Sequence, residues 1–305
     1  MDKKARFFVA GHQGRVGSAI VRKLKSIGAN DIITKTRSEC DLTDKNIVEA
    51  VFNHERPQYA IFAAADLKYP EVFPADLIYN NIAMQTNFIE TCKKFEIKKM
   101  LFLGSSCIYP EICRMPIKES QFMYEDFKIP KQWYSIAKIA GIKTCQAYNQ
   151  QYGTNYISVI PSTVYGKGDA YGRKPSHIIS TMIRRFHEAK INEDAAVCLP
   201  GRPPYKIDFI YIDDLADACI FLMENYNSSE IINVGRSLGI SIELIAGYIG
   251  AVVDYRGCIT WDALESHSTS SKILDSSKIT NLGWVHKTNM YEGLKQTYNY
   301  FLENV

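Results

Sequence analysis

A glycine-rich turn near the N-terminus limits the possible folds more than any other stretch of the sequence. The apolar run over residues 6–10 predicts a buried strand, and a Gly-x-x-Gly-x-x-Gly pattern follows it over 11–17. From there an amphipathic helix is predicted to about Leu24. Glycines at such a turn allow a close backbone approach, and the N-terminus of the helix then faces a pyrophosphate. The order of strand, glycine turn and helix therefore predicts the first unit of a dinucleotide-binding fold.

The end of the second predicted strand indicates which dinucleotide is bound. This strand covers residues 31–34, and Lys35-Thr36-Arg37 follows it. A site for NAD usually places an acid here to bind the ribose 2′-hydroxyl, whereas two cations suit the 2′-phosphate of NADP. The sequence therefore favours NADP, and the alternative interpretation is a pair of ordinary surface bases.

Strands and helices alternate along the first half of the chain. Further strands are predicted over 58–65, 99–104, 156–160, 208–212 and 231–234, with a short one over 258–261, and long helices are predicted over 74–95 and 132–152. This alternation predicts an α/β fold with a Rossmann-type doubly wound parallel sheet. After Gly166 the pattern loosens, which indicates a smaller mixed α/β substrate domain. We expect 1–166, completed by 208–235, to form the Rossmann domain, and 167–207 and 236–305 to form the substrate domain.

Composition argues against several classes of function. The 305 residues carry a net charge of +3, which is too close to neutral to indicate a nucleic-acid or membrane surface. No apolar run reaches membrane-spanning length, and the first residues contain no hydrophobic signal region. The eight cysteines are scattered, without Cys-x-x-Cys or zinc-like spacing, which is typical of reduced thiols. We therefore expect a cytoplasmic protein without a metal site.

A tyrosine and a lysine four residues apart form the main catalytic pattern. Tyr134 and Lys138 fall on one face of a predicted helix. A free phenol has a pKa of about 10, and a nearby ammonium lowers that pKa, so the pair can exchange a proton with an alcohol or carbonyl oxygen. The pattern alone is weak, because many such pairs lie on solvated helix faces. Ser105 and Ser106 follow the strand over 99–104, at the edge where open α/β sheets bind ligands, although two serines there also suit a plain turn.

These motifs occur in an order that resembles the extended short-chain dehydrogenase/reductase superfamily. Within it, the chain is most similar to the GDP-L-fucose synthase family, and the resemblance covers nearly the whole length. The segments that carry it are 9–14, Gly-Ser-Ser-Cys-Ile-Tyr-Pro at 104–110, 134–143, Ser-His-Ile-Ile at 176–179, 184–189, 232–235 and Leu-Gly-Trp at 282–284. The resemblance implies NADPH-dependent reduction of the C4 keto group of a GDP-linked 4-keto-deoxy sugar, together with 3,5-epimerisation.

Catalytic residues follow from the resemblance, which implies a triad of serine, tyrosine and lysine and a separate acid/base pair for epimerisation. The keto group acidifies the protons at C3 and C5, and inverting those carbons needs one group to remove a proton and another to return one. A thiol and an imidazole, with free pKa values of about 8.5 and 6.5, suit this task. Without the resemblance, the cysteine would be interpreted as a buried thiol and the histidine as a loop residue. The implied catalytic residues are Ser106 (or its neighbour Ser105), Tyr134, Lys138, Cys107 and His177.

Binding residues are implied in the same way. The implied cofactor contacts are Gly11, His12, Gln13, Gly14, Arg15, Val16, Gly17, Lys35, Arg37, Asp41, Leu42, Ala63, Ala64, Ala65, Tyr134, Lys138, Pro161 and His177. The implied contacts of the GDP-sugar substrate are Ser105, Ser106, Cys107, Thr163, Arg184, Lys206 and Lys272. Among these, Arg184 or Lys206 would meet the diphosphate, with Lys272 as a further cation.

Several positions depart from the family pattern. The loop after the strand over 58–65 covers only 66–73, where the family has a longer loop that contains glycine. The substituted positions are Gln13 for a basic residue of the glycine turn, Trp133 for proline, Thr163 for asparagine, and Ile207 and Ser271 for two arginines. These changes fall on the expected pyrophosphate and sugar contacts, so they leave the identity of the sugar open.

Other interpretations are compatible with the same residues. One is a C4 reductase only, acting for example on a GDP-linked 6-deoxyheptose that a partner enzyme epimerises. Others are a 4,6-dehydratase or 4-epimerase of the superfamily, or a nucleotide-sensing protein without catalysis. By analogy with the superfamily, we expect a homodimer through a four-helix bundle of the helices over 74–95 and 132–152. The loops over 66–73 and 168–176 are candidates for a mobile lid.

Overall fold

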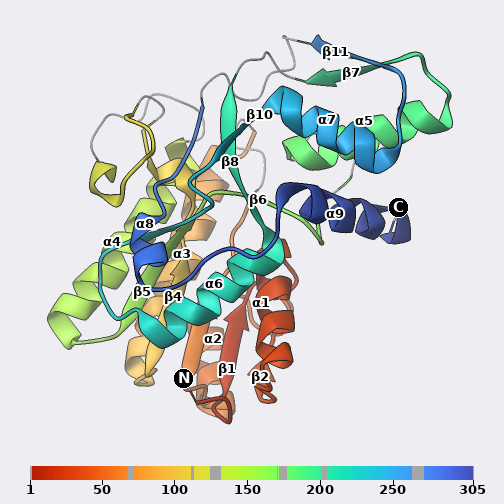
Figure 1. Cartoon of the computed structure of the whole chain (residues 1–305). Coiled ribbons are helices and arrows are strands. Elements are labelled where there is room, and N and C mark those ends of the chain that lie inside the picture. Colours follow the sequence, from red (N-terminus) through yellow and green to blue (C-terminus); the bar gives the residue numbers. More distant parts are fainter. Residues whose placement is uncertain are drawn as a thin grey trace.

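A parallel sheet forms the centre of the molecule (Figure 1). The computed structural model describes residues 2–67, 72–110, 113–123, 132–169, 171, 177–200, 205–262 and 271–304. Among these residues, six strands form one sheet in the order β2-β1-β3-β4-β5-β9, with every neighbouring pair parallel. The strands are β1 (Phe7–Ala10), β2 (Ile32–Ile33), β3 (Tyr59–Phe62), β4 (Lys99–Leu103), β5 (Tyr156–Pro161) and β9 (Ile232–Val234).

Side chains of the sheet alternate between two hydrophobic cores, because successive residues of a strand point to opposite faces. In β1, Phe7 and Val9 join one core, whereas Phe8 and Ala10 join the other. Beside the central sheet, α1 (Arg15–Ser26) and α6 (Ile212–Asn225) pack into the first core, and α2 (Lys45–Glu55), α3 (Pro74–Lys94) and α4 (Gln132–Tyr152) pack into the second. Helices on both faces confirm the predicted doubly wound α/β fold.

Two smaller sheets lie outside the central one. One has the strand order β10-β8-β6, with β6 parallel and β10 antiparallel to β8, and the other pairs β7 with β11 in parallel. Figure 1 shows α5, α7, β7 and β11 grouped at one end of the molecule, away from β2. The elements of this part are β6 (Thr163–Tyr165), α5 (Ile178–Ile191), β7 (Ala196–Pro200), β8 (Lys206–Tyr211), β10 (Gly239–Ser241), α7 (Ile242–Val253), β11 (Cys258–Asp262) and α9 (Met290–Asn304).

The segment 208–235 divides between the two parts of the molecule. The strand predicted over 208–212 corresponds to β8, but β8 pairs with β6 and β10 and not with the central sheet. The helix α6 and the strand β9 that follow it do pack in the central layers. The expectation that the whole segment returns to the Rossmann part is therefore wrong for β8, and the domain bounds stay a prediction.

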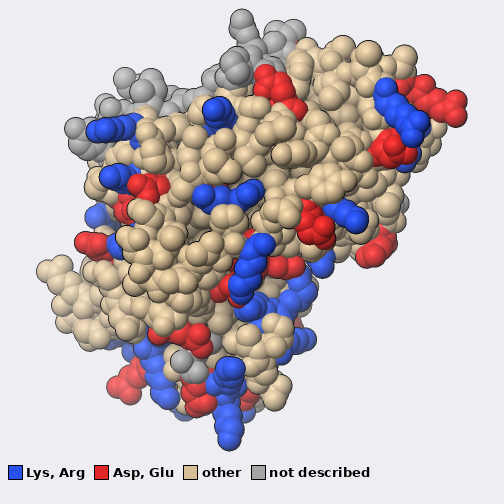
Figure 2. Space-filling model, in the orientation of Figure 1, with Lys and Arg blue, Asp and Glu red and all other residues tan. Residues whose placement is uncertain are grey.

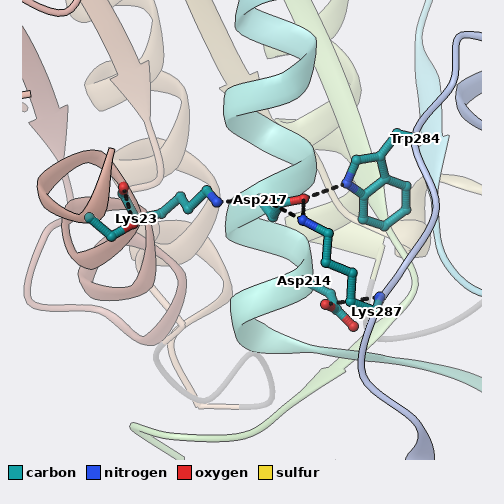
Figure 3. A network of polar contacts seen from close by, with 6 residues as sticks. Lys23, Asp214, Asp217, Trp284 and Lys287 are labelled. Atoms are coloured by element: carbon teal, nitrogen blue, oxygen red, sulfur yellow. Dashed lines mark hydrogen bonds and ion pairs between the residues drawn. The ribbon is translucent and has the colours of Figure 1, made fainter. Parts of the chain in front are cut away.

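A polar network on α6 connects the central layers with the C-terminal segment that follows α8 (Ser277–Asn281) (Figure 3). Asp217 of α6 accepts from Lys23 Nζ of α1 at 2.5 Å and from Trp284 Nε1 at 2.9 Å. Lys287 Nζ lies 3.4 Å from the same carboxylate, and Asp214 accepts the backbone N–H of Lys287 at 3.3 Å. The network holds the last segment of the chain against the helix that begins at the glycine turn.

The surface carries both signs of charge. Figure 2 shows basic and acidic side chains mixed over one face of the molecule. Exposed ion pairs such as Arg6–Asp31, at 2.7 Å, and Lys94–Glu49, at 2.6 Å, join oppositely charged neighbours. No helix within the described residues is long and apolar enough to cross a membrane.

Candidate active site

A cavity of about 850 Å³ opens where β1, β3, β4 and β5 end. The carboxyl ends of parallel strands are where doubly wound sheets bind ligands. The predicted cofactor residues that line this cavity are Gly11, His12, Gln13, Gly14, Arg15, Val16, Lys35, Arg37, Asp41, Leu42, Ala63, Ala64, Ala65, Tyr134, Pro161 and His177. The predicted catalytic and substrate residues that line it are Ser105, Ser106, Cys107, Thr163 and Lys272, besides Tyr134 and His177.

Four predicted site residues do not line this cavity. Gly17 lies behind the glycine turn, and Lys138 is buried behind Tyr134. Arg184 projects from α5 and lies 3.8 Å from Glu188, an ion pair one helical turn along. Lys206 is exposed at the start of β8. The two cations expected at the diphosphate are therefore outside the cavity wall, whereas Lys272 is part of it.

The glycine turn needs glycine because other backbone atoms lie against it. Gly11 has a φ of +80°, and a Cβ there would lie 2.6 Å from the backbone N of Ala64. A Cβ at Gly17 would lie 2.1 Å from the carbonyl oxygen of Gly11. The turn therefore packs directly on the end of β3 and on the start of α1, which leaves the backbone N–H groups at the helix N-terminus facing the cavity.

The two cations after β2 differ in how they are held. Lys35 Nζ contacts Glu55 at 2.6 Å, and this hydrogen bond raises the pKa of Lys35. Arg37 lies 3.6 Å from Asp41 and has a side chain that is 67% exposed. Because Arg37 is only loosely held at the cavity edge, it is the better placed of the two to bind a 2′-phosphate.

Two residues that line the cavity form a buried ion pair that the sequence did not predict. Arg15, the first residue of α1, binds Asp169, whose side chain has no exposed surface. Burial raises the pKa of Asp169, and Arg15 counteracts that rise. Asp169 follows β6 in a polar loop, and its Oδ2 accepts the backbone N–H of Gly166 at 3.4 Å. The pair holds this loop at the N-terminus of α1, beside the cavity.

Lys138 supports Tyr134 from inside the protein. Its Nζ donates to the Leu103 carbonyl oxygen at 2.9 Å and lies 5.7 Å from the centre of the Tyr134 ring. Burial lowers the pKa of Lys138 to about 8, against an opposite effect of Cys107. From α3, Gln85 Nε2 donates to the Ala137 carbonyl oxygen of α4 at 2.6 Å. The helix that carries both catalytic candidates is therefore fixed against β4 and α3.

Burial, and not the lysine, dominates the protonation of Tyr134. Desolvation raises the pKa of this phenol, and the nearby Cys107 adds to the rise. The expectation that the phenol has a pKa below its ordinary value is therefore wrong for this structure, because burial outweighs any opposite effect of Lys138. A neutral phenol at neutral pH is the form that donates a proton to a carbonyl oxygen.

The two serines of the turn after β4 differ in their hydrogen bonds. The Ser105 hydroxyl accepts the backbone N–H of Cys107 at 3.3 Å and caps the short helix η1 (Ser106–Ile108). The Ser135 hydroxyl of α4 donates to the Cys107 carbonyl oxygen at 2.9 Å. Ser105 therefore stabilises the turn itself, and this geometry favours Ser106 as the serine that meets a substrate carbonyl.

His177 faces the same cavity from the second part of the molecule. It is the residue before the first turn of α5 and lines the cavity. The residue keeps some exposed surface. Desolvation of the ring by the surrounding protein nevertheless lowers the pKa of His177 to about 4, and the Arg15 guanidinium adds to this effect. The imidazole is therefore neutral near pH 7 and able to accept a proton.

Some expectations fall on residues outside the described part of the chain. Of the two predicted lid loops, residues 68–71 in the first and 170 and 172–176 in the second lie outside it. Ser176, which precedes His177 in a motif of the resemblance, is among them. Within the described chain, Ser162, Asp66 and Met84 also line the cavity, and the sequence did not predict them. They lie next to predicted residues or on α3, without a motif of their own.

Comparisons with known proteins agree with this site. A model of the NAD dependent epimerase/dehydratase family matches residues 7–235. GDP-L-fucose synthase 1 of Arabidopsis thaliana is 44% identical over 100% of this chain and 95% of that protein. The GDP-L-fucose synthase of Escherichia coli K12 is 38% identical over 99% of this chain and 98% of that protein. A solved structure, the GDP-mannoheptose C4 reductase from Campylobacter jejuni with NADP bound, is 31% identical and has a TM-score of 0.89 over 99% of both chains. The chain therefore belongs to the NAD dependent epimerase/dehydratase family of extended short-chain dehydrogenases/reductases and, within it, to the GDP-L-fucose synthase family.

Proposed function

We propose that this protein reduces the C4 keto group of a GDP-linked 4-keto-6-deoxy sugar and also inverts C3 and C5 of that sugar. The observation that carries the proposal is the set of groups sharing one cavity. A half-buried, neutral phenol (Tyr134), a serine and a thiol after β4 (Ser106 and Cys107) and a neutral imidazole (His177) all line it. The full-length similarity to GDP-L-fucose synthases supports the GDP-sugar as the substrate.

The cofactor is NADP(H), and the residues present fit it. A similar solved structure holds NADP. Here the glycine turn leaves no room for a side chain at Gly11, and Arg37 stands at the end of β2 where the 2′-phosphate of the ribose lies in such folds. When bound, NADPH supplies the hydride for C4.

The chain's own residues handle the proton of the reduction. Tyr134 donates its phenolic proton to the oxygen at C4, because burial keeps the phenol neutral. Ser106 binds the same oxygen and orients the carbonyl. Lys138 stays fixed on Leu103 behind the phenol and stabilises the negative charge left on it. A general acid in such a position typically contributes about 10²–10⁴-fold to the rate.

Epimerisation requires a base and an acid on opposite faces of the sugar. His177 is neutral and takes a proton from the carbon next to the keto group. Cys107 returns a proton on the other face. The two residues come from different parts of the molecule, the turn after β4 and the start of α5, so the sugar ring lies between them in this proposal.

A reductase without epimerase activity is the second candidate. The similar Campylobacter jejuni structure is described as a GDP-mannoheptose C4 reductase, and it matches this chain over 99% of its length. The substitutions at Thr163 and Ser271 change the expected sugar contacts. In that case Cys107 and His177 would bind the sugar without exchanging protons.

We further propose that the protein forms a homodimer through α3 and α4. These two helices pack on each other, and they expose large apolar or aromatic side chains. The exposed fractions are 69% for Tyr79, 36% for Ile136 and 46% for Tyr152. Light scattering with Tyr79→Glu tests this arrangement: a monomer is the expected result, and an unchanged dimer would place the interface elsewhere.

Three variants test the proposed chemistry with GDP-4-keto-6-deoxymannose as substrate. Tyr134→Phe is expected to slow NADPH oxidation at least about 100-fold while NADPH still binds. Tyr226→Phe removes a hydroxyl that donates to Glu230 far from the cavity and is the matched control. Cys107→Ser is expected to abolish deuterium exchange at C3 or C5. Unimpaired hydride transfer in Tyr134→Phe would refute the reduction mechanism, and unimpaired exchange in Cys107→Ser would refute the epimerase role.

A further inference from the structure

The turn that carries Ser106 and Cys107 is held from two sides. On the side of α4, the Ser135 hydroxyl binds the Cys107 carbonyl oxygen. On the other side, the ring of Tyr109 is buried, with 3% exposed, and its hydroxyl donates to Asn233 Oδ1 at 2.7 Å. Tyr109 does not line the cavity. Its effect on the site therefore passes through the backbone that it shares with Cys107, two residues earlier.

Asn233 uses all of its side-chain hydrogen-bonding groups. The residue lies in β9 with no exposed surface. Its Nδ2 donates to the carbonyl oxygens of Ile117 at 3.0 Å and Asp275 at 3.1 Å, and its Oδ1 accepts from Tyr109. Because these groups are buried, a lost hydrogen bond leaves an unmet polar group in the interior, and the neighbouring backbone must shift to satisfy it.

The same asparagine also holds the segment that brings Lys272 to the cavity. Ile117 donates its N–H to the Ile273 carbonyl oxygen at 2.7 Å and accepts the N–H of Asp275 at 2.8 Å. Lys272 donates its backbone N–H to the Lys206 carbonyl oxygen of β8 at 2.9 Å. Two segments of the cavity wall, the turn after β4 and the segment 272–275, are thus tied to one side chain of β9.

We propose that Tyr109 and Asn233 are a positioning pair that sets the Cys107 thiol, and with it Lys272, against the bound sugar. This inference rests on the proposed epimerase/reductase function. Tyr134 depends less on the pair. Ser135 does join α4 to the turn, but α4 is also anchored separately through the hydrogen bonds to Leu103 and from Gln85. Loosening the pair therefore displaces the thiol more than the phenol.

The expected effect follows from how sharply proton transfer depends on distance. A displacement of about 1 Å at a reacting group costs about 10²-fold in rate. We expect the loss of one hydroxyl to relax the turn by less than that, and so Tyr109→Phe to slow exchange at C3 and C5 by about tenfold. Binding of NADPH, which involves the glycine turn on the other side of the cavity, should stay unchanged.

The experiment measures deuterium exchange and cofactor binding on the same variants. Full-length wild type, Tyr109→Phe and the control Tyr226→Phe are incubated with GDP-4-keto-6-deoxymannose in heavy water, without NADPH, and exchange is followed by NMR. NADPH affinity is measured by fluorescence. Slower exchange in Tyr109→Phe alone, with unchanged NADPH affinity, is the expected result. Exchange at the wild-type rate, or an equal loss in the Tyr226→Phe control, would overturn the positioning role.

Alkylation of Cys107 gives a second readout that does not depend on turnover. The rate is read by peptide mass spectrometry, with the exposed thiols of Cys198 and Cys258 as internal references. We expect the Cys107 rate to change in Tyr109→Phe and not in Tyr226→Phe, and an unchanged rate would overturn the inference. A wild-type enzyme that shows no exchange would refute the epimerase proposal, and the alkylation rate then decides the positioning role alone.

Discussion

Substitutions at Asp217 and its partner Lys287 should lower the free energy of unfolding by different amounts, and the hydrogen bonds drawn in Figure 3 set the size of each loss. The side chain of Asp217 is 18% exposed, and its carboxylate accepts from three donors that differ in distance and exposure. Lys23 is at 2.5 Å and partly buried, Trp284 Nε1 is at 2.9 Å in a residue with 5% exposed, and Lys287 is at 3.4 Å and 74% exposed. The geometry ranks Lys23 and Trp284 well above Lys287.

The magnitudes follow from that ranking. Asp217→Asn keeps an oxygen for Trp284 but loses the charge facing Lys23, which should cost about 1–2 kcal/mol in free energy of unfolding. Asp217→Ala also leaves the indole N–H without its acceptor and should cost about 3 kcal/mol. Lys287→Met removes an exposed and distant cation and should cost about 0.5 kcal/mol or less.

Urea unfolding, followed by tryptophan fluorescence, measures the three costs. Burial acts to raise the pKa of Asp217, but the hydrogen bonds from Lys23 and Trp284 outweigh it and hold that pKa below its ordinary value. The contribution of the carboxylate is therefore present above the unfolded pKa of about 4 and is lost as the pH falls through the folded value. The difference between wild type and Asp217→Asn should shrink on acidification. A Lys287→Met variant as unstable as Asp217→Asn would refute the reasoning.

Three further predictions concern the cavity. Gly17→Ala should impair both folding yield and NADPH binding, measured by thermal melting and fluorescence, because its methyl group would lie 2.1 Å from the Gly11 carbonyl oxygen. Arg37→Ala should weaken NADPH binding by at least about tenfold and more than Lys35→Ala, because a carboxylate already holds Lys35. Deuterium exchange that uses His177 as base should keep its rate from about pH 8 to 5.5, since the base form persists down to a pKa of about 4, whereas an ordinary imidazole would lose about tenfold.

The pattern of apolar residues was sufficient to predict the central layers. Four buried residues in β1 alternate between two cores, and strands alternate with helices along the first half of the chain, so a parallel sheet covered on both faces is the expected arrangement. Three strands within the described part of the chain were not predicted: β6, β7 and β10. They have only three to five residues each, too few to show a period, and they are defined by their pairing with distant segments.

Sequence motifs predicted most of the residues that line the cavity, but the ion pairs between them and the shifts in their pKa values required the structure. Arg15 belongs to a recognisable turn, whereas its partner Asp169 lies 154 residues away in a polar loop without a motif. The sequence placed Lys138 beside Tyr134 but gave no measure of how far the protein desolvates the phenol, and this desolvation reversed the expected shift of its pKa. The sequence also could not decide whether Ser105 or Ser106 meets the substrate. That choice required the structure, in which the Ser105 hydroxyl accepts the backbone N–H of Cys107 in its own turn.

The most direct test of the central claim is turnover of GDP-4-keto-6-deoxymannose by the wild-type protein in heavy water with NADPH. NADPH oxidation is followed by absorbance, and the product is examined by mass spectrometry and NMR. The proposed function predicts NADPH consumption and a product with deuterium at both C3 and C5. Consumption without deuterium would contradict the epimerase role of Cys107 and His177 and leave a C4 reductase. No consumption at all would contradict the assignment of this GDP-sugar as the substrate.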